Sequence, residues 1–304
     1  MKAQTNNIDK DCINLLMSCD DRFFKPFLTT LYSVIKNTES SVNLYFIGHL
    51  SQKQIFKVKK ILGNGDFKIY DSCEDIFNNF QNIVLPPQYS QNIFFRIYAP
   101  YVFQKVDKLL WIDSDIIFTD DISLMFNYEM NGKLIAAWQD IHPVSSKIKK
   151  IDNYDIKTYF CSGIVLFNCS AIRKRYTLNK YRGIVDHLLK TNLRMFDQDI
   201  LNIIFRNDVE FFPSCFSTYI WNKYNDIKII VDNFSSFHYA GDVKPWQKRY
   251  YNFKNESLYW KYGKHNFALS YIIYRFLYSR IYFVFKCLYF IFKRKKPGKD
   301  NKVL

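Results

Sequence analysis

The fold of this chain is decided around Leu109-Leu110-Trp111-Ile112-Asp113-Ser114-Asp115, which Ile116-Ile117-Phe118 follows directly. The apolar residues predict a buried strand that ends at two aspartates. Carboxylates bordered by apolar residues are costly unless a cation pairs with them. Oxygen ligands at a strand end suit a hard divalent cation such as Mg²⁺ or Mn²⁺. Such a metal can neutralise a phosphate-bearing substrate.

The aspartate pair has a second interpretation. Asp113 and Asp115 then cap a turn after the strand, while Asp120 and Asp121 cap a following helix. The motif and its apolar neighbours leave the two interpretations about even. Residues elsewhere in the chain have to decide between them.

Length and composition describe a large folded domain, alone or with an extension. The chain has 304 residues, with 29 Phe, 23 Tyr and 5 Trp but few Gly and Pro, so disorder is expected only at the ends. Its seven cysteines form no Cys-x-x-Cys pair, which argues against a zinc knuckle or a disulfide framework. Reduced thiols and a polar N-terminus without a signal-peptide pattern predict a cytoplasmic protein.

The net charge of +15 is concentrated in the C-terminal part of the chain. From Lys248 onward there are 14 Lys and Arg against two acids, a net charge of +12. The preceding 247 residues carry 29 bases and 26 acids, a net charge of +3. The chain has no Cys/His finger, and residues 1–247 contain no basic recognition helix, so nucleic acid is not the expected partner.

Strand and helix patterns alternate along the first two thirds of the chain. Strands are predicted at residues 13–18, 42–47, 67–70, 109–112, 116–118, 134–138 and 164–167, and helices at 26–37, 51–62, 92–101, 180–190 and 198–205. This alternation indicates an α/β sheet with parallel strands. Ligands bind at the carboxyl ends of such strands, where Asp20-Asp21 and the Asp113–Asp115 pair both fall.

A series of motifs then follows in order along roughly residues 12–247. They are Ser18-Cys19-Asp20-Asp21, Phe95-Arg96-Ile97-Tyr98, the Asp113 motif, Ala137-Trp138-Gln139-Asp140, Tyr159-Phe160-Cys161-Ser162-Gly163, Asp197-Gln198-Asp199-Ile200-Leu201-Asn202 and His238-Tyr239-Ala240-Gly241-Asp242-Val243-Lys244-Pro245-Trp246. With these motifs the chain resembles glycosyltransferase family 8, the retaining galactosyl- and glucosyltransferases of bacterial lipopolysaccharide and capsule synthesis.

The resemblance implies a GT-A nucleotide-sugar-binding fold, a Rossmann-like mixed sheet flanked by helices, over residues 1–250, with a small, basic, aromatic-rich helical extension over 251–304. It also implies a UDP-glucose or UDP-galactose donor and a divalent metal held by Asp113, Asp115 and His238. Two carboxylates and an imidazole favour Mn²⁺, with Mg²⁺ as the alternative. The resemblance assigns the remaining site residues to donor binding (Asp20, Asp21, Ser114, Ser162, Gly163, Gly241, Lys244) and to the surroundings of the reacting sugar (Arg96, Asp140, Asp197, Gln198).

An amide such as that of Gln198 is too poor a nucleophile for an easy double displacement. The expected mechanism is therefore a front-face, oxocarbenium-like substitution, in which the leaving phosphate deprotonates the acceptor hydroxyl. A sugar trapped covalently on Asp197 or Asp199 would contradict it.

Two residues depart from the family pattern. Cys161 stands where the family commonly has Asn, and Arg22 stands where a small polar residue is usual. These differences leave the choice between glucose and galactose open. Taken singly, His238 also fits a core histidine, Arg96 a surface base, Asp197 a helix cap and Lys244 a loop charge.

The tail from Phe267 to Phe292 is apolar and aromatic but is interrupted by Arg275, Arg280 and Lys286. It therefore lacks the roughly 20 apolar residues that span a bilayer. At helical spacing one face carries Tyr271, Arg275, Tyr278, Ser279, Tyr282, Lys286, Tyr289 and Lys293, and Lys293-Arg294-Lys295-Lys296 follows. This pattern predicts a helix at the anionic cytoplasmic surface of the inner membrane, near a lipid-linked glycan acceptor. The alternative is a helix docked on the catalytic domain.

Two other functions fit parts of the sequence. A haloacid-dehalogenase-type phosphatase also places Asp-x-Asp after an apolar strand, but its motif has Thr or Val at the position where Ile117 stands. It also leaves the Gln198 and His238 segments without a role. A membrane-bound sugar-nucleotide-binding protein that has lost catalysis is the other candidate, and Cys161 is its one hint.

Overall fold

The computed structural model describes residues 12–71, 78–80, 82–86, 89–142, 145–222 and 234–294. The chain divides into two compact units. The first unit comprises residues 1–219 and 230–238, and the second comprises 220–229 and 239–304. The expected boundary near residue 250 between a catalytic domain and an extension stays a prediction, because these units are defined by compactness alone.

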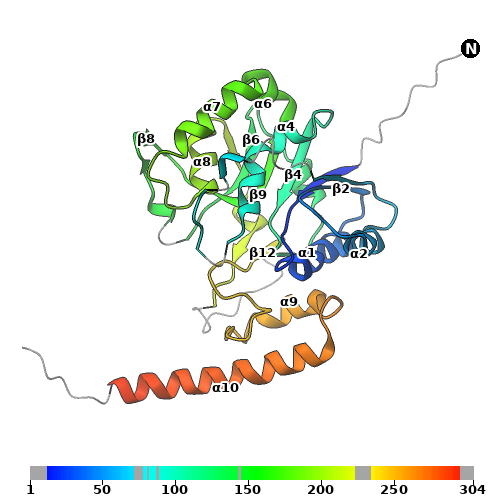
Figure 1. Ribbon diagram of the computed structural model, residues 1–304, viewed down its shortest axis with the longest axis vertical. Coiled ribbons are helices and arrows are strands. Elements are labelled where there is room, and N and C mark those ends of the chain that lie inside the picture. Colours follow the sequence, from blue (N-terminus) through cyan, green and yellow to red (C-terminus); the bar gives the residue numbers. More distant parts are fainter. Residues whose placement is uncertain are drawn as a thin grey trace, which may run out of the picture. The chain divides into compact units, whose positions relative to one another are not determined.

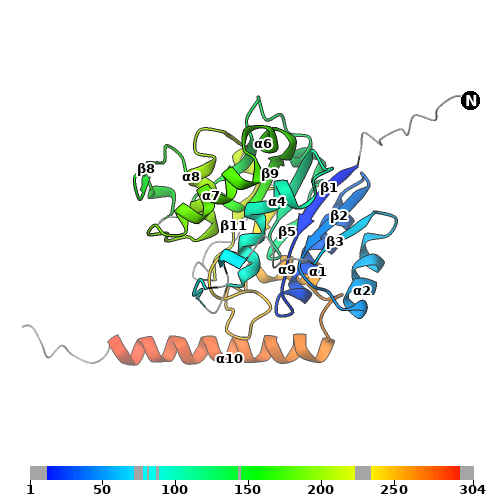
Figure 2. The same cartoon turned by 45° about the horizontal axis from the view of Figure 1, so that its top comes forward.

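The first unit is formed around a seven-stranded sheet with the strand order β10-β6-β9-β4-β1-β2-β3 (Figures 1 and 2). Its central strands are apolar and buried. In β9, for example, the first eight residues are all buried. The strands are β1 (Ile13–Met17), β2 (Val42–Ile47), β3 (Phe67–Tyr70), β4 (Lys108–Ile112), β6 (Ile135–Gln139), β9 (Phe160–Asn168) and β10 (Val209–Phe211).

The sheet is mixed, as the GT-A fold implied by the family resemblance predicted, although the strand–helix alternation taken alone indicated parallel strands. Strands β1, β2, β3 and β4 are mutually parallel, and β10 is parallel to β6. Strand β9 runs antiparallel to both of its neighbours, β4 and β6. Because β9 is reversed, its first residues lie beside the last residues of β4, so Gly163 and Asp113 meet at one edge of the sheet.

Helices cover this sheet, and most of them were predicted from the sequence. Figures 1 and 2 show α1 and α2 beside β1–β3, and α6, α7 and α8 beside β9. The Ser51 side chain caps α2 in a reciprocal capping box with Gln54, and this cap lies at the start of the helix predicted over 51–62. The helices are α1 (Phe24–Asn37), α2 (Gln52–Leu62), α4 (Ala99–Val102), α5 (Ser123–Phe126), α6 (Cys169–Arg175), α7 (Leu178–Leu188) and α8 (Asp197–Ile204).

Short elements complete the first unit. The single helix expected over residues 92–101 is a 3₁₀-helix, Gln91–Tyr98, that leads into α4. The other 3₁₀-helices are Asn78–Phe80, Ser145–Lys147 and Ser214–Phe216, and the strands β7 (Lys150–Ile151) and β8 (Tyr154–Asp155) form a hairpin.

A small second sheet brings distant parts of the first unit together. It consists of β11 (Thr218–Tyr219), β12 (Ser236–His238) and β5 (Ile116–Phe118). Strand β12 pairs antiparallel with β5, so that His238 lies opposite Ile116. This register carries His238 to the turn that contains Asp113 and Asp115.

The second unit contains α9 (Glu256–Gly263) and the long helix α10 (Leu269–Arg294). The Glu256 carboxylate accepts hydrogen bonds from Arg275 and Arg280 of α10. Arg275 and Ser279 are fully buried, so part of the polar face that the sequence singled out is turned inward. Among the described residues, no helix combines the length and the apolar character that crossing a bilayer requires.

Candidate functional site

Asp113, Asp115 and His238 form the cluster that the sequence predicted. One ligand atom from each side chain can be chosen so that all three atoms lie within 4.8 Å of one another. Asp113 directly follows β4, and its backbone N–H donates to the Gly163 carbonyl at 2.9 Å. Pairing of β12 with β5 supplies His238. Two carboxylates and an imidazole at this spacing are a suitable ligand set for a divalent cation such as Mn²⁺.

Gly163 makes room for the cluster. A Cβ atom at this position would lie 2.8 Å from His238 Cε1 and 3.2 Å from Asp113 Oδ2. Any side chain would therefore displace the candidate ligands. The β9 backbone passes against the cluster closely enough that only glycine fits.

Without a metal, His238 and Asp115 form an ion pair. His238 Nε2 lies 3.2 Å from Asp115 Oδ1. Burial alone would lower the pKa of His238, but the Asp115 carboxylate and the Cys161 thiol together raise that pKa to about 10. The imidazole therefore carries a proton at neutral pH, and a metal that binds Nε2 has to displace it.

Arg96 is a buried cation directly behind the cluster, and its side chain is only 4% exposed. It contacts both oxygens of Asp113, with Nη2–Oδ1 at 2.7 Å and Nη1–Oδ2 at 3.2 Å. Its Nε lies 3.2 Å from Asp197 Oδ2, and Nη1 donates to the Ser162 carbonyl at 2.5 Å. Arg96 thus connects a candidate metal ligand to the acidic start of α8.

Gln198 and Asp140 form a second buried group in the site. Gln198 Nε2 donates to Asp140 Oδ2 at 3.0 Å, and Gln198 Oε1 accepts the Ser162 N–H at 3.0 Å. The Ser145 hydroxyl also donates to Asp140 Oδ2, at 2.7 Å. Both ends of the Gln198 amide are therefore fixed, which confines its orientation.

The two aspartates that flank Gln198 have different environments. Burial raises the pKa of Asp197 to about 6, although Arg96 opposes this shift. Asp199 accepts the Tyr159 hydroxyl at 2.6 Å and the N–H groups of Arg194 and Met195 at 2.7 and 2.9 Å. Asp199 therefore holds the chain in place before α8, where Phe196 adopts a positive φ of 48°.

The turn that follows β1 places two further predicted donor-binding residues, Asp20 and Asp21, at the carboxyl end of that strand. Asp20 accepts hydrogen bonds from Arg22 Nε and Nη2 at 2.9 and 2.8 Å. Asp21 accepts a hydrogen bond from Gln54 Nε2 at 2.9 Å. The Ser114 hydroxyl donates to the Ser18 carbonyl at 3.0 Å and so ties the aspartate turn to β1.

Gly241 and Lys244 belong to the second unit, and their roles toward a donor stay predictions. Gly241 has a φ of +95°, which favours glycine. Lys244 Nζ donates to the Tyr239 carbonyl at 2.9 Å. This bond holds the ammonium group within its own loop.

Two aromatic residues belong to the site although no role there was predicted for them. Trp111 Nε1 donates to Asp113 Oδ1 at 2.9 Å, and its ring lies under the Arg96 guanidinium at 4.8 Å. Residues two apart on a strand share a face, and this spacing could have revealed Trp111. Tyr219 packs 5.3 Å from the His238 ring, and no local pattern around β11 signals this contact.

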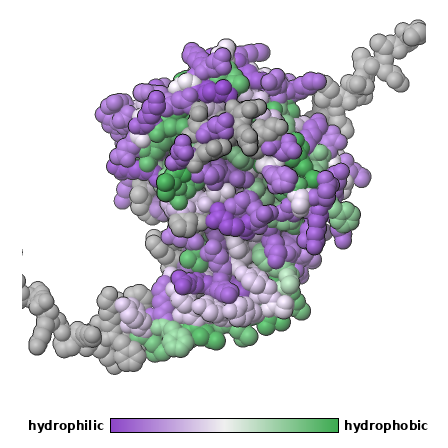
Figure 3. Space-filling view, viewed as in Figure 1, coloured by the Kyte–Doolittle hydropathy of each residue, from purple (hydrophilic) through white to green (hydrophobic). Residues whose placement is uncertain are grey.

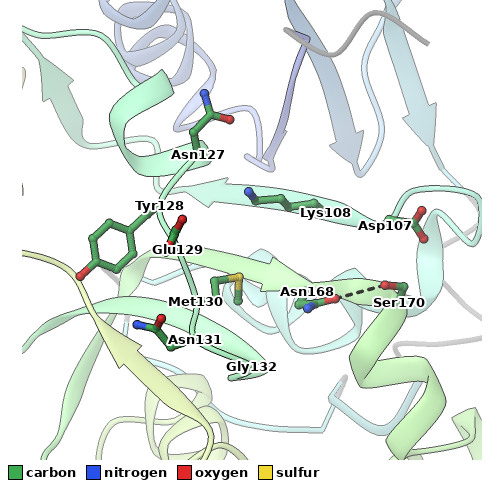
Figure 4. Close-up of a pocket in the computed structure, with 10 residues that line it drawn as sticks. All are labelled: Asp107, Lys108, Asn127, Tyr128, Glu129, Met130, Asn131, Gly132, Asn168 and Ser170. Atoms are coloured by element: carbon green, nitrogen blue, oxygen red, sulfur yellow. Dashed lines mark hydrogen bonds between the residues drawn. The ribbon is translucent and has the colours of Figure 1, made fainter. Parts of the chain in front are cut away.

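A separate hollow of about 560 Å³ lies at the other end of β4 (Figure 4). Lys108, which begins β4, and Asn168, which ends β9, both line it, together with Tyr128. None of the residues that line it is a predicted site residue. The hollow is therefore distinct from the cluster at Asp113 and Asp115.

The fold and the site define an α/β protein with a cluster of side chains that could hold a metal ion, and comparison with known proteins specifies it further. The model of the family "Glycosyl transferase family 8" matches residues 14–249. The chain belongs to this family.

Among its relatives, a lipopolysaccharide 1,2-glucosyltransferase of Escherichia coli K12 is 23% identical over 274 residues, covering 83% of this chain and 80% of the relative. General stress protein A of Bacillus subtilis is 25% identical over 261 residues, covering 78% of this chain and 88% of the relative. The crystal structure of the galactosyltransferase LgtC with donor and acceptor sugar analogs superimposes with a TM-score of 0.69 at 19% identity. The superposition covers 83% of this chain and 96% of the LgtC chain.

These comparisons confirm the resemblance to glycosyltransferase family 8 and the GT-A fold. A transferase acting on a nucleotide sugar follows from the family. The family match also argues against the phosphatase interpretation, which explained only the aspartate pair.

Proposed function

We propose that this protein transfers glucose or galactose from a UDP-sugar to a saccharide acceptor with retention of configuration. The observation that carries the proposal is the Asp113–Asp115–His238 cluster, which lies in the same unit as the fixed Asp140–Gln198 pair. Relatives named as glucosyl- and galactosyltransferases support both hexoses. The proposed acceptor is a lipopolysaccharide or lipooligosaccharide core, or another surface glycan.

The proposed metal is Mn²⁺, with Mg²⁺ as the alternative. Asp113, Asp115 and His238 would hold it, and the close β9 backbone at Gly163 supports this placement. The metal would supply positive charge against the diphosphate and the departing UDP. Arg96 orients Asp113 through two contacts.

The contacts around Gln198 favour a front-face substitution over a covalent sugar intermediate. Gln198 Oε1 already accepts the Ser162 N–H, and both oxygens of Asp199 accept hydrogen bonds. Asp197 is paired with Arg96. Each candidate nucleophile thus has a structural partner, so we expect the acceptor hydroxyl to attack directly.

The test is transfer to truncated lipopolysaccharide cores of defined structure, with each UDP-hexose and Mn²⁺. Mass spectrometry reads the added hexose, and NMR coupling constants read its anomeric configuration. We expect one UDP-hexose to give an α-linked product, the same configuration as in the donor. UDP-sugar binding without turnover on any acceptor would favour the catalytically impaired alternative, and a β-linked product would refute retention.

We further propose that α10 attaches the protein to the anionic cytoplasmic surface of the inner membrane. One side of α10 exposes Leu277, Ile281 and Phe285 at 61%, 57% and 67%. Hydrophobic residues line this side in Figure 3. A continuous exposed apolar face beside many Lys and Arg residues suits an anionic lipid surface.

The opposite side of α10 is bound within the second unit. Tyr271 donates its hydroxyl to the Trp246 carbonyl at 2.7 Å, and Lys286 donates to the Tyr251 hydroxyl at 2.7 Å. Lys248 lies over the Tyr274 ring at 4.6 Å, at the border of the exposed side. Tyrosine and lysine at that border match the headgroup region of a bilayer.

Vesicle co-sedimentation tests this attachment. The variant Leu277→Ser/Ile281→Ser/Phe285→Ser should bind vesicles of phosphatidylglycerol and phosphatidylcholine about tenfold more weakly than wild type, because three apolar groups no longer enter the lipid. The control is Phe56→Ser/Leu124→Ser, which removes exposed apolar residues from the first unit. Equal binding by all three proteins would refute the proposal.

A further inference from the structure

Tyr219 is a buried side chain of the site that has no assigned role. It ends β11, is 6% exposed, and lies opposite His238 in the parallel pairing of β11 with β12. Its ring centroid is 5.3 Å from that of His238 and 5.0 Å from that of Trp138. Tyr219 thus packs between the candidate metal ligand and the strand β6, which leads to Asp140.

The Tyr219 hydroxyl interacts by hydrogen bonding with the Cys161 thiol and the Asp140 carboxylate. Burial, together with these two groups, raises the pKa of Tyr219 well above its usual value. Because an ionised carboxylate only accepts hydrogen bonds, the Tyr219 hydroxyl is the donor to Asp140.

Each partner of Tyr219 contacts a residue with a predicted role in the reaction. Cys161 Sγ lies 3.8 Å from His238 Nδ1 and accepts the Gly163 N–H at 3.3 Å. Asp140 Oδ2 accepts the Gln198 amide at 3.0 Å. A continuous line of side-chain contacts therefore runs from His238 through Cys161, Tyr219 and Asp140 to Gln198.

We propose that Tyr219 is a positioning residue that aligns the metal ligand His238 through Cys161 and the sugar-site residue Gln198 through Asp140. His238 Nε2 faces Asp115, so the group at Nδ1 sets the orientation of the ring. Partners at the second nitrogen of a ligating histidine typically change metal affinity 10- to 100-fold when they are removed. The part of the proposal that concerns Gln198 rests on the proposed function.

The direct test is Mn²⁺ binding to Tyr219→Phe, measured by titration calorimetry without any donor. Phe keeps the ring against His238 and Trp138 and removes only the hydroxyl. We expect about tenfold weaker Mn²⁺ binding with an unchanged thermal unfolding midpoint of the metal-free protein. Tyr101→Phe is the matched control, because it removes another buried tyrosine hydroxyl, which donates to the Tyr176 carbonyl.

A double-mutant cycle separates alignment from general packing. Cys161→Ala should weaken Mn²⁺ binding to a similar degree, and the double variant should be little worse than either single one, since both act through the same contact with His238. In turnover, Tyr219→Phe should lower kcat about tenfold at saturating Mn²⁺.

Wild-type Mn²⁺ affinity in Tyr219→Phe, fully additive losses in the cycle, or an unchanged kcat would each overturn the proposal. If wild type binds Mn²⁺ but turns over neither UDP-hexose, the proposed function fails. The Mn²⁺ titrations then still decide whether Tyr219 aligns His238.

Discussion

Replacing Arg96 by Met should destabilise the first unit more than any single exposed charge can. Arg96 is 4% exposed and contacts Asp113 at 2.7 and 3.2 Å and Asp197 at 3.2 Å. Met retains most of the packing but leaves two carboxylates without their cation. Removing one partner of a buried ion pair typically costs about 3–5 kcal/mol. We expect a loss of that size in the free energy of unfolding at pH 8.

The loss should shrink as the pH falls. In the wild type, burial raises the pKa of Asp197 to about 6, and Arg96 limits that rise. An aspartate whose pKa is raised on folding stabilises the fold below its unfolded pKa, and this contribution disappears as the pH rises through the folded value. Without Arg96 the folded pKa rises further. The protonated carboxyl then makes the variant less defective at about pH 5 than at pH 8.

Urea unfolding followed by circular dichroism measures both effects. The matched control is Arg175→Met, which removes a 2.6 Å ion pair with Asp208 from a side chain that is 47% exposed, and such pairs contribute about 0–1 kcal/mol. A loss below about 1 kcal/mol for Arg96→Met at pH 8, or an equal loss in the control, would refute the reasoning.

Three further predictions concern the metal cluster and the tail. Mn²⁺ affinity should rise about tenfold per pH unit from pH 6.5 to 8.5 in titration calorimetry, because the metal displaces the proton that Asp115 holds on His238, whose pKa is about 10; a flat profile would contradict this. Gly163→Ala should weaken Mn²⁺ binding at least about tenfold while the far-ultraviolet circular dichroism stays unchanged, because the new Cβ would lie 2.8 Å from His238 Cε1. Wild-type Mn²⁺ affinity would contradict this, because it would show that the side chains of the cluster move aside without losing the metal. Glu256→Gln should cost about 3–5 kcal/mol in the unfolding of the second unit, since it leaves Arg275 buried without its carboxylate; hydrogen exchange in α10 at the wild-type rate would count against this.

Sequence reasoning located the elements whose signal is local. The apolar run before Asp113 predicted β4, and Ser51 predicted the start of α2, because burial and capping act within a few residues. The cluster of Asp113, Asp115 and His238 was also predicted, but only through the family resemblance. Nothing local to His238 indicates that β12 pairs with β5.

Features set by tertiary packing could not be predicted in this way. The reversal of β9 leaves no trace in the run from Phe160 to Asn168, because strand direction depends on the neighbours β4 and β6. Helical periodicity separates a polar face of α10 from an apolar one, but it does not show which face packs within the second unit. Glu256 decides this, since its carboxylate draws Arg275 inward and leaves the apolar face exposed.

The most direct test of a metal-dependent hexosyltransferase site is UDP release from UDP-glucose and UDP-galactose with Mn²⁺. Wild type should release UDP from at least one donor, and addition of a chelator should abolish the release. Asp115→Asn should lower the rate at least about 100-fold, because it removes a charged ligand from the cluster. Equal rates for wild type and Asp115→Asn, or release that survives the chelator, would contradict the assignment of the site.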